Sequence, residues 1–141
     1  MMRWFCCIGL VAVLCLAPTL TLADDLGGVN TILCTASVAT LCLDDGECET
    51  GPPWMWNIPQ FIEIDLAAKQ LRTTRASGEN RSTAIKNLER ADGLVFLQGV
   101  EMGRAFSFVI TEETGLSSFA VARDGVTVGG FGACTPIEGR R

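Results

Sequence analysis

The chain has 141 residues, with 11 lysines and arginines against 16 aspartates and glutamates, a formal net charge of −5, and neither histidine nor tyrosine. A mildly acidic chain without a basic cluster is a poor candidate for binding nucleic acid. The lack of histidine excludes Ser-His-Asp and Cys-His nucleophile systems, His-ligated metals and the usual general base near neutral pH. The composition therefore favours a protein that is not an enzyme and has no cofactor.

The first 23 residues have the pattern of a secretory signal peptide. Arg3 supplies a positive charge, Trp4 to Leu16 is apolar, and Thr21 to Ala23 ends in a small residue suited to cleavage. The apolar segment is shorter than the roughly 20 residues that span a membrane. No second long apolar run follows it. We therefore expect cleavage after Ala23.

Cleavage would leave a single domain, residues 24–141, which is long enough to bury a moderate core. It removes one basic and no acidic residue, so the net charge of the mature chain becomes −6. Cys15 also permits a lipoprotein signal, but Leu14 is bulky where such signals carry a small residue. We expect a periplasmic or secreted protein without a membrane span in the mature chain.

Four cysteines follow the signal segment: Cys34, Cys42, Cys48 and Cys134. An even number in a small secreted chain indicates two disulfides, for which three pairings exist. Cys42 and Cys48 flank a turn-like segment and could close a small loop. Cys34 would then pair with Cys134 and tie the first strand to the last. A metal site is the weaker alternative, because there is no histidine and no CxxC pair.

The elements before the centre of the chain are expected to be strands and loops. Thr31 to Leu43 is rich in β-branched residues and predicts a strand, although its alanines also permit a short helix. Asp44 to Trp56 contains the cysteine loop and two adjacent prolines, which predict a loop with an extended stretch. Phe61 to Leu66 alternates between apolar and acidic residues, as in a strand with one buried face. Gln70 to Thr74 predicts another strand, and Arg75 to Ser82 predicts a polar loop.

The segment from Leu94 to Cys134 predicts a meander, because short apolar runs alternate with turns that contain glycine. The strands expected in this half are Ala84 to Arg90, Leu94 to Val100, Arg104 to Thr111, Leu116 to Arg123 and Val126 to Cys134. Asp124-Gly125 is the strongest hairpin signal. Gly129-Gly130 suggests a bulge or sharp bend. About eight short antiparallel strands predict an all-β fold, a lipocalin-like barrel or half-barrel, with a β-sandwich as the alternative.

Two neighbouring strands of this meander have unlike faces. Phe106, Phe108 and Ile110 share one face of their strand, and Phe119 and Val121 share one face of the next. The opposite face carries small uncharged side chains: Ala105, Ser107, Val109, Ser118, Ala120 and Ala122. Because a wet face normally carries charges, we expect either tight packing over both faces or a narrow interior lined by the small side chains.

Trp54 and Trp56 lie in the only aromatic-rich loop of the chain, among three prolines. Trp is enriched in binding hot spots, so these two residues are the candidates for binding an apolar ligand or a protein partner. The alternative is that both tryptophans cover one end of the barrel.

Charged residues provide weaker candidates. Glu63 and Asp65 share one face of a strand about 7 Å apart and could act as the paired carboxylates of a hydrolase. The solvent face of an ordinary strand has the same pattern. Asp44 to Glu49 could attract Ca²⁺ but lacks EF-hand spacing. Three arginines near the polar loop could hold an anion: Arg72, Arg75 and Arg81.

Four stretches of the chain are CTASVATLCLDDGEC, IPQFIEIDLAAKQL, GLVFLQGVEMGRAFSFVITEETG and the terminal FGAC. Together they resemble a group of small secreted proteins of Gram-negative bacteria that carry no assigned function. The resemblance covers most of the mature chain and implies a periplasmic location and a meander fold. It supplies no catalytic residues.

We therefore expect a non-catalytic binding or accessory module for an apolar ligand or a protein partner. The alternatives are a carboxylate-dependent hydrolase and a passive envelope component.

Overall fold

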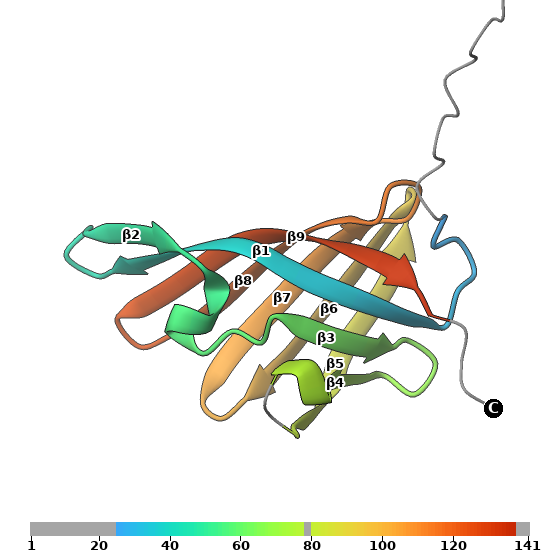
Figure 1. Ribbon diagram of the computed structural model, residues 1–141, viewed down its shortest axis with the longest axis horizontal. Coiled ribbons are helices and arrows are strands. Elements are labelled where there is room, and N and C mark those ends of the chain that lie inside the picture. The colour runs from blue at the N-terminus through green and yellow to red at the C-terminus, as the bar shows by residue number, and fades with distance from the viewer. Residues whose placement is uncertain (1–24, 78–79, 138–141) are drawn as a thin grey trace, which may run out of the picture.

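The computed structural model describes residues 25–77 and 80–137, so the expected signal peptide lies outside the described residues. These residues form strands and two single turns of 3₁₀ helix (Figure 1). The elements are β1 (Thr31–Leu43), β2 (Cys48–Gly51), η1 (Pro53–Trp56), β3 (Phe61–Asp65), β4 (Gln70–Thr73), η2 (Arg75–Ser77), β5 (Ser82–Ala91), β6 (Leu94–Glu101), β7 (Arg104–Thr111), β8 (Leu116–Arg123) and β9 (Val126–Pro136).

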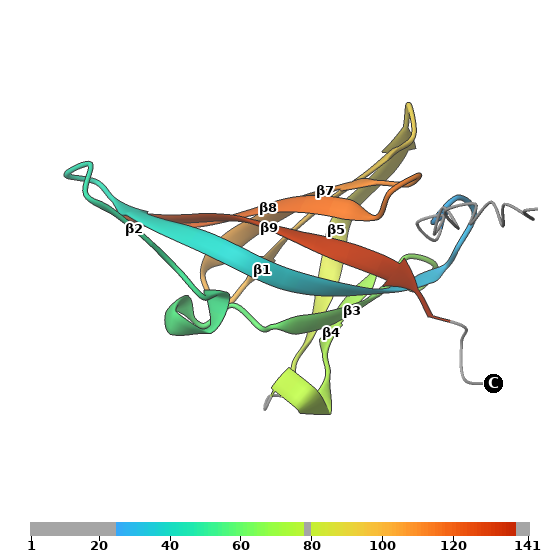
Figure 2. The same cartoon turned by 45° about the horizontal axis from the view of Figure 1, so that its top comes forward.

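Eight of the strands, β1 and β3 to β9, close into an antiparallel barrel (Figures 1 and 2). Each strand from β3 onward pairs with the next in the chain, and β1 pairs with β3 on one side. On its other side β1 pairs with β9 along almost its whole length, from Ile32 opposite Pro136 to Leu43 opposite Val126. The predicted barrel is therefore confirmed in its closed form.

The segment from Asp44 to Trp56 is more regular than predicted. Cys48–Gly51 forms β2, which pairs with the end of β1 and extends the sheet beyond the barrel as a hairpin. The hydroxyls of Thr40 and Thr50 lie 2.8 Å apart across this pair. The segment was predicted as a loop with an extended stretch; Cys48–Gly51 is extended but is a paired strand and not part of a loop, because cross-strand contacts and the neighbouring disulfide hold it.

The other predicted strands are confirmed, with ends that differ by at most two residues. The first matches β1 at both ends, so the helical alternative is not realised. The polar loop begins with η2 and gives way to β5 at Ser82.

The interior of the barrel is filled by apolar side chains from all around its wall. Ile32, Ile64, Val95, Leu97 and Ile110 are completely buried. A barrel of about eight strands is just wide enough for such side chains to fill it.

The small side chains of β7 and β8 lie on the outside of the barrel. Ala105, Ala120 and Ala122 are exposed to solvent, so the prediction that their face is covered or lines an interior was wrong. The phenylalanines of the same two strands take the inward positions. Because strand residues alternate in direction, the small residues must then face outward.

Two phenylalanine rings lie over glycines of the adjacent strands. Phe106 is opposite Gly99, and Phe119 is opposite Gly130. A Cβ atom added to either glycine would come within 2.4 Å of the facing ring. A ring that covers a glycine in this way replaces the missing side chain and helps fix the register of the pair.

The expected bulge at Gly129-Gly130 was wrong. Both residues stay in continuous register with β8 and β1. The register break in this part of the barrel lies on β1 instead, between Ala36 and Val38. Gly130 provides space for the Phe119 ring.

The two disulfides are Cys34–Cys134 and Cys42–Cys48, as predicted. Cys34 and Cys134 are register partners in the β1–β9 pair, and both are buried. Cys42 and Cys48 are register partners in the β1–β2 hairpin. Two disulfides indicate an oxidising compartment outside the cytoplasm.

The space beneath the Phe119 ring predicts unequal effects for two adjacent glycines. Gly130→Ala should lower the free energy of unfolding by about 1–3 kcal/mol, because the new methyl group overpacks the core. Gly129→Ala is the matched control, since the nearest atom to its Cβ is 3.9 Å away. Thermal unfolding followed by circular dichroism measures both. Equal losses would contradict the packing described for Phe119.

The disulfides should also differ in their contribution to stability. Replacing Cys34 and Cys134 with alanine should cost about 4–5 kcal/mol, because the bridge closes a loop of about 100 residues in the unfolded chain. Replacing Cys42 and Cys48 should cost about 2 kcal/mol, since that loop is short. Urea unfolding of the two double variants provides the comparison. A larger loss for the hairpin pair would mean that β2, not the β1–β9 pair, controls stability.

Candidate functional site

The aromatic-rich loop and the polar loop predicted from the sequence both lie at one end of the barrel. The turn after β2, the loop between β4 and β5, and the turn between β6 and β7 all meet there (Figure 1). We call residues 52–57 the Trp turn. We call the group formed by Arg81, Thr83, Glu101 and Arg104 the mouth.

The Trp turn is a short, fixed structure. Pro53 occupies its first turn, and Asn57 ends it in the left-handed conformation with φ of 58°, which Asn adopts more readily than most residues. The N–H of Asn57 donates to the carbonyl of Trp54, and the N–H of Ile58 donates to that of Pro53, both at 3.2 Å. Pro53 and Ile58 are buried, so the turn is anchored at both ends.

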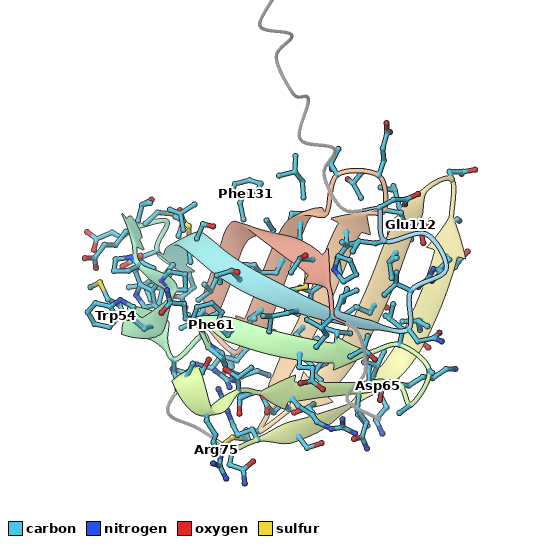
Figure 3. All side chains as sticks on the ribbon, turned by 45° about the vertical axis from the view of Figure 1, so that its right-hand side comes forward. Trp54, Phe61, Asp65, Arg75, Glu112 and Phe131 are labelled. Atoms are coloured by element: carbon cyan, nitrogen blue, oxygen red, sulfur yellow. A yellow bond between two sulfur atoms is a disulfide. The ribbon has the colours of Figure 1, made fainter. Side chains whose placement is uncertain are left out.

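The two tryptophans of the turn have different environments. Trp56 is half-buried and packs against the core. Trp54 is 69% exposed and projects from the surface (Figure 3). Met55, next to it, is 48% exposed. The position of Trp56 matches the alternative in which a tryptophan covers the end of the barrel, whereas most of the Trp54 side chain faces solvent.

Surface hollows lie on both sides of the Trp turn. One, of about 330 Å³, is lined by Met55, Trp56 and the ends of β7, β8 and β9. The other, of about 250 Å³, separates Trp54 from Ala76 and Ser77 of η2. A partner that contacts Trp54 could therefore also fill concave surface beside it.

Two separate loops hold the mouth in place. Met102 and Gly103 both have positive φ, 49° and 75°, as in a type I′ hairpin turn, so Glu101 and Arg104 lie opposite each other on β6 and β7. Arg81 is held against Thr73, which accepts its N–H in a hydrogen bond of 2.8 Å. These segments are some 20 residues apart in sequence, as the Arg81 to Glu101 contact shows.

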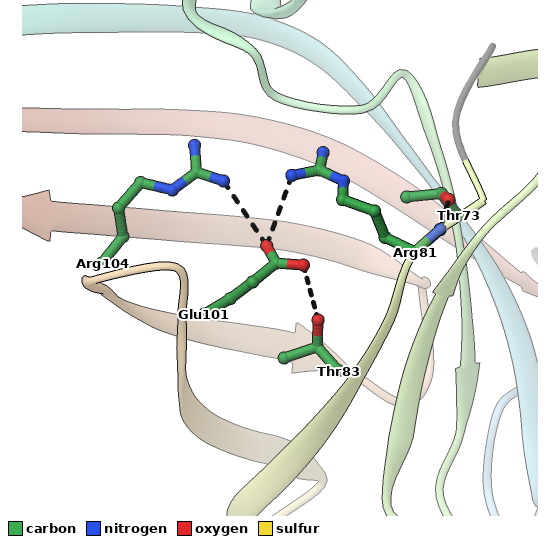
Figure 4. A network of polar contacts seen from close by, with 5 residues as sticks. All are labelled: Thr73, Arg81, Thr83, Glu101 and Arg104. Atoms are coloured by element: carbon green, nitrogen blue, oxygen red, sulfur yellow. Dashed lines mark hydrogen bonds and ion pairs between the residues drawn. The ribbon is translucent and has the colours of Figure 1, made fainter.

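Glu101 is the centre of the mouth (Figure 4). Its Oε2 lies 3.5 Å from Nη1 of Arg81 and 3.4 Å from Nη2 of Arg104. Its Oε1 accepts a hydrogen bond of 2.6 Å from the hydroxyl of Thr83. The three charged side chains are only 16–24% exposed. Both ion pairs are longer than the 2.7–2.9 Å of a tight charge-assisted hydrogen bond.

The mouth opens onto a small cavity of about 60 Å³. Its base is made by Phe106, Phe108 and Phe119, all at least nine-tenths buried, with Ile62 and Leu71 beside them. The arrangement is an apolar space whose lining also includes three arginines, Arg72, Arg81 and Arg104, and one glutamate, Glu101.

The predicted carboxylate pair lies on the outer face of the barrel. Glu63 and Asp65 share the guanidinium of Arg72, at 3.7 and 3.9 Å. Arg72 is thus committed to two carboxylates, and Arg75 is exposed on η2. Of the three arginines expected to form one cluster, Arg72 and Arg81 both line the cavity described above, and Arg75 does not.

The sequence analysis did not identify Glu101 and Arg104 as candidate site residues. The turn between them was predicted, and the rule that residues flanking a two-residue hairpin turn face each other could have paired them. Their meeting with Arg81 had no sequence signal, because it depends on how β4, β5 and β6 are placed around the barrel.

The acidic segment forms the tip of the β1–β2 hairpin. Asp44, Asp45, Glu47 and Glu49 are all exposed there. Asp45 accepts a hydrogen bond from the N–H of Glu47 at 3.0 Å, which closes the turn. Within residues 25–77 and 80–137, no three cysteine, aspartate or glutamate side chains gather as metal ligands would.

No protein-family model matches the sequence, and no curated protein is significantly similar to it. Among the residues that the structure describes, no helix has the length and apolar character needed to cross a membrane.

The unequal burial of the tryptophans predicts unequal effects on stability. Trp56→Ala should lower the free energy of unfolding by about 2 kcal/mol, because it removes the buried part of a ring that packs against the core. Trp54→Ala should change it by no more than about 0.5 kcal/mol, as is usual for exposed side chains. Urea unfolding monitored by circular dichroism tests both variants. A large loss for Trp54→Ala would mean that this ring supports the fold.

Proposed function

We propose that the protein is a non-catalytic binding module of the bacterial periplasm or the secreted space, and that it docks a protein partner around Trp54. The observation that carries this proposal is a tryptophan 69% exposed on a turn that the backbone holds in place. Trp buries a large area on binding and loses few rotamers, so it is favoured in hot spots.

The small enclosed volume of the barrel fits a partner that binds at the surface better than an apolar ligand that binds inside. Ligand pockets for drug-sized molecules usually measure about 300–1,000 Å³ and lie inside apolar walls. The enclosed space at the mouth is about 60 Å³. Two larger hollows are open and lie beside the Trp turn, where a partner can reach them, and a third lies on the outer face of β5 to β8.

The charge near the Trp turn suggests the chemistry of the partner. The hairpin that precedes the turn in sequence carries four exposed carboxylates within six residues, Asp44 to Glu49. Charges placed at the rim of an interface steer association toward a partner of the opposite sign. The partner is thus a protein segment with an apolar anchor for Trp54 and basic residues beside it.

Two observations support the proposed compartment: the signal-like first 23 residues and the two disulfides. Both suit the periplasm or the extracellular space, where disulfides persist. The hairpin tip and the Trp turn are then presented on a scaffold closed by one of these bridges.

Site-specific photo-cross-linking tests the proposal in cells. Benzoylphenylalanine placed at position 54 should give a discrete cross-linked adduct in the periplasmic fraction. With the partner so identified, Trp54→Ala should weaken its dissociation constant by about 30-fold, the loss expected of a hot-spot residue.

Phe131 provides the matched control, because it is an aromatic residue 65% exposed on the outer face of β9 (Figure 3). Benzoylphenylalanine at position 131 should give no adduct, and Phe131→Ala should leave the affinity unchanged. Adducts at position 131 alone, or equal adducts at both positions, would place the docking surface elsewhere and refute the role of Trp54.

A further inference from the structure

The two disulfides differ in how readily a thiol in solution can reach them. Cys34 and Cys134 are 3% and 8% exposed, and their bridge lies within the closed β1–β9 pair. Cys48 is exposed and Cys42 is half-buried, on the hairpin that extends beyond the barrel (Figure 1). A thiolate must reach a sulfur atom to open a disulfide, and exposed bridges are the labile ones. The hairpin bridge can therefore react with a thiol while the barrel stays folded.

The hairpin bridge holds a strand whose interface with the barrel is small. β2 is the last strand on its side of the sheet, and its four residues pair with the end of β1. Across this pair the hydroxyls of Thr40 and Thr50 lie 2.8 Å apart, at the surface. Every residue from Leu43 to Thr50 is exposed, and a two-stranded hairpin without further packing is only marginally stable in water. The disulfide is thus the main constraint that keeps β2 on β1.

Opening of the bridge would release β2 without opening the barrel. The end of β1 that pairs with β2, residues 39–43, also pairs with β9 on its other side. The N–H of Asp44 donates to the carbonyl of Gly125 at 3.2 Å, in the turn between β8 and β9. β1 would therefore remain in place when β2 separates from it.

The Trp turn packs against the end of β2. A Cβ atom added to Gly51 would lie 3.1 Å from Sδ of Met55 and 3.2 Å from the Trp56 ring. Release of β2 would remove the surface on which these two side chains rest. Pro53 and Ile58 are buried, so the base of the turn would stay in the barrel. The bridge therefore controls the outer part of the turn and not its attachment.

The side chains around the bridge indicate which thiols can approach it. Asp44, Asp45 and Glu47 are exposed in the loop that the bridge closes, and Glu49 is exposed directly after it. A thiol attacks a disulfide as its anion. The four carboxylates therefore repel a negatively charged reagent and favour one that carries positive charge beside its thiolate.

We propose that Cys42–Cys48 is a site of thiol–disulfide exchange with a protein dithiol that has basic residues beside its thiols, and that reduction releases β2 and loosens the Trp turn. The exchange does not depend on docking at Trp54, whereas its use as a control of docking rests on the function proposed above.

The exchange takes place in two steps. A thiolate of the dithiol forms a bond to Sγ of Cys48, the more exposed residue of the pair. The disulfide breaks, its electron pair leaves on Sγ of Cys42, and that sulfur takes up a proton. The second thiol of the reagent then displaces Sγ of Cys48, which is protonated in turn, and the reagent leaves as a disulfide. The hairpin gains two electrons and two protons, and the reverse exchange restores the bridge.

Graded reduction of the full mature chain with dithiothreitol tests the site. Iodoacetamide should then label Cys42 and Cys48 at least about 100-fold faster than Cys34 and Cys134, because the buried bridge reacts only when the barrel opens. Mass spectrometry of the chain and its peptides identifies the labelled cysteines. Circular dichroism of the form labelled in the hairpin alone should keep the sheet signal. Labelling of both bridges at one rate, or loss of the sheet signal with the first labelling, would refute the site.

Two monothiols of opposite charge test the chemistry of the reagent. Cysteamine should open the hairpin bridge at least about fivefold faster than glutathione, compared per thiolate at low salt, because the carboxylates attract the cation and repel the anion. Replacing Glu47 and Glu49 with glutamine should about halve this ratio of rates. Replacing Glu89 and Glu113, two exposed glutamates outside the hairpin, is the matched control and should leave the ratio unchanged. Equal rates for the two monothiols would refute a basic reagent.

Hydrogen exchange measures what reduction releases. In the form labelled in the hairpin alone, the amides of residues 47–51 should exchange at least about tenfold faster than in the oxidised chain, whereas those of β9 should be unchanged. The double variant with Cys42→Ser and Cys48→Ser has neither bridge nor label and should behave in the same way. Unchanged exchange of residues 47–51 in both forms would refute the release of β2.

Cross-linking from position 54 tests the effect on docking. In the double serine variant the yield of the adduct should fall at least about threefold, because a loosened turn must be ordered again on binding. An unchanged yield would overturn the control of docking by the bridge. Absence of an adduct even in the oxidised chain would refute docking at Trp54 and its control together, whereas the exchange site is decided by the labelling rates alone.

Discussion

The structure depends on the pairing of its first strand with its last. An open sheet of eight strands would expose the edges of β1 and β9, and closure joins them to each other instead. The pair spans nearly all of β1, and the Cys34–Cys134 bridge crosses it in the buried interior. Because these strands are a hundred residues apart in sequence, their meeting carries a high entropic cost. The disulfide reduces that cost because it restricts the conformations available to the unfolded chain.

Closure at this size determines where binding can take place. The ring of eight strands encloses a narrow interior, and the phenylalanines of β7 and β8 occupy much of it by lying over Gly99 and Gly130. The glycines let large rings fit within the barrel without moving its wall. What remains is a small space at one end. The Trp turn and the mouth lie at that same end, so the proposed docking surface lies at the rim and on the outside of the barrel.

The charged residues divide into two groups with different roles. On the outer wall, Arg72 is balanced by two partly exposed carboxylates, an arrangement that contributes little to stability. At the mouth, two arginines share one carboxylate above an apolar floor. The sequence contains arginines and acids in similar patterns at both places.

Several features of the protein were determined by the sequence alone. The alternation of apolar residues and the glycine turns predicted the strands of the meander, because such patterns act over neighbouring residues. The cysteine spacing led to the correct disulfide pairing, since the short loop left one partner for each remaining cysteine. The Trp turn was recognised as an exceptional segment, but its two tryptophans could not be told apart, because burial depends on what lies across the barrel.

Only the tertiary structure decided the remainder. The short strand β2 forms because it pairs with the end of β1. The small residues of β7 and β8 face solvent because the phenylalanines of these strands occupy the inward positions. The mouth is assembled from β5, β6 and β7 and from the loop that carries Arg81. Contacts between residues so far apart produce no periodic pattern in the sequence from which they could be predicted. They follow from the closure of the sheet, which places strands by their hydrogen-bond register and not by local sequence.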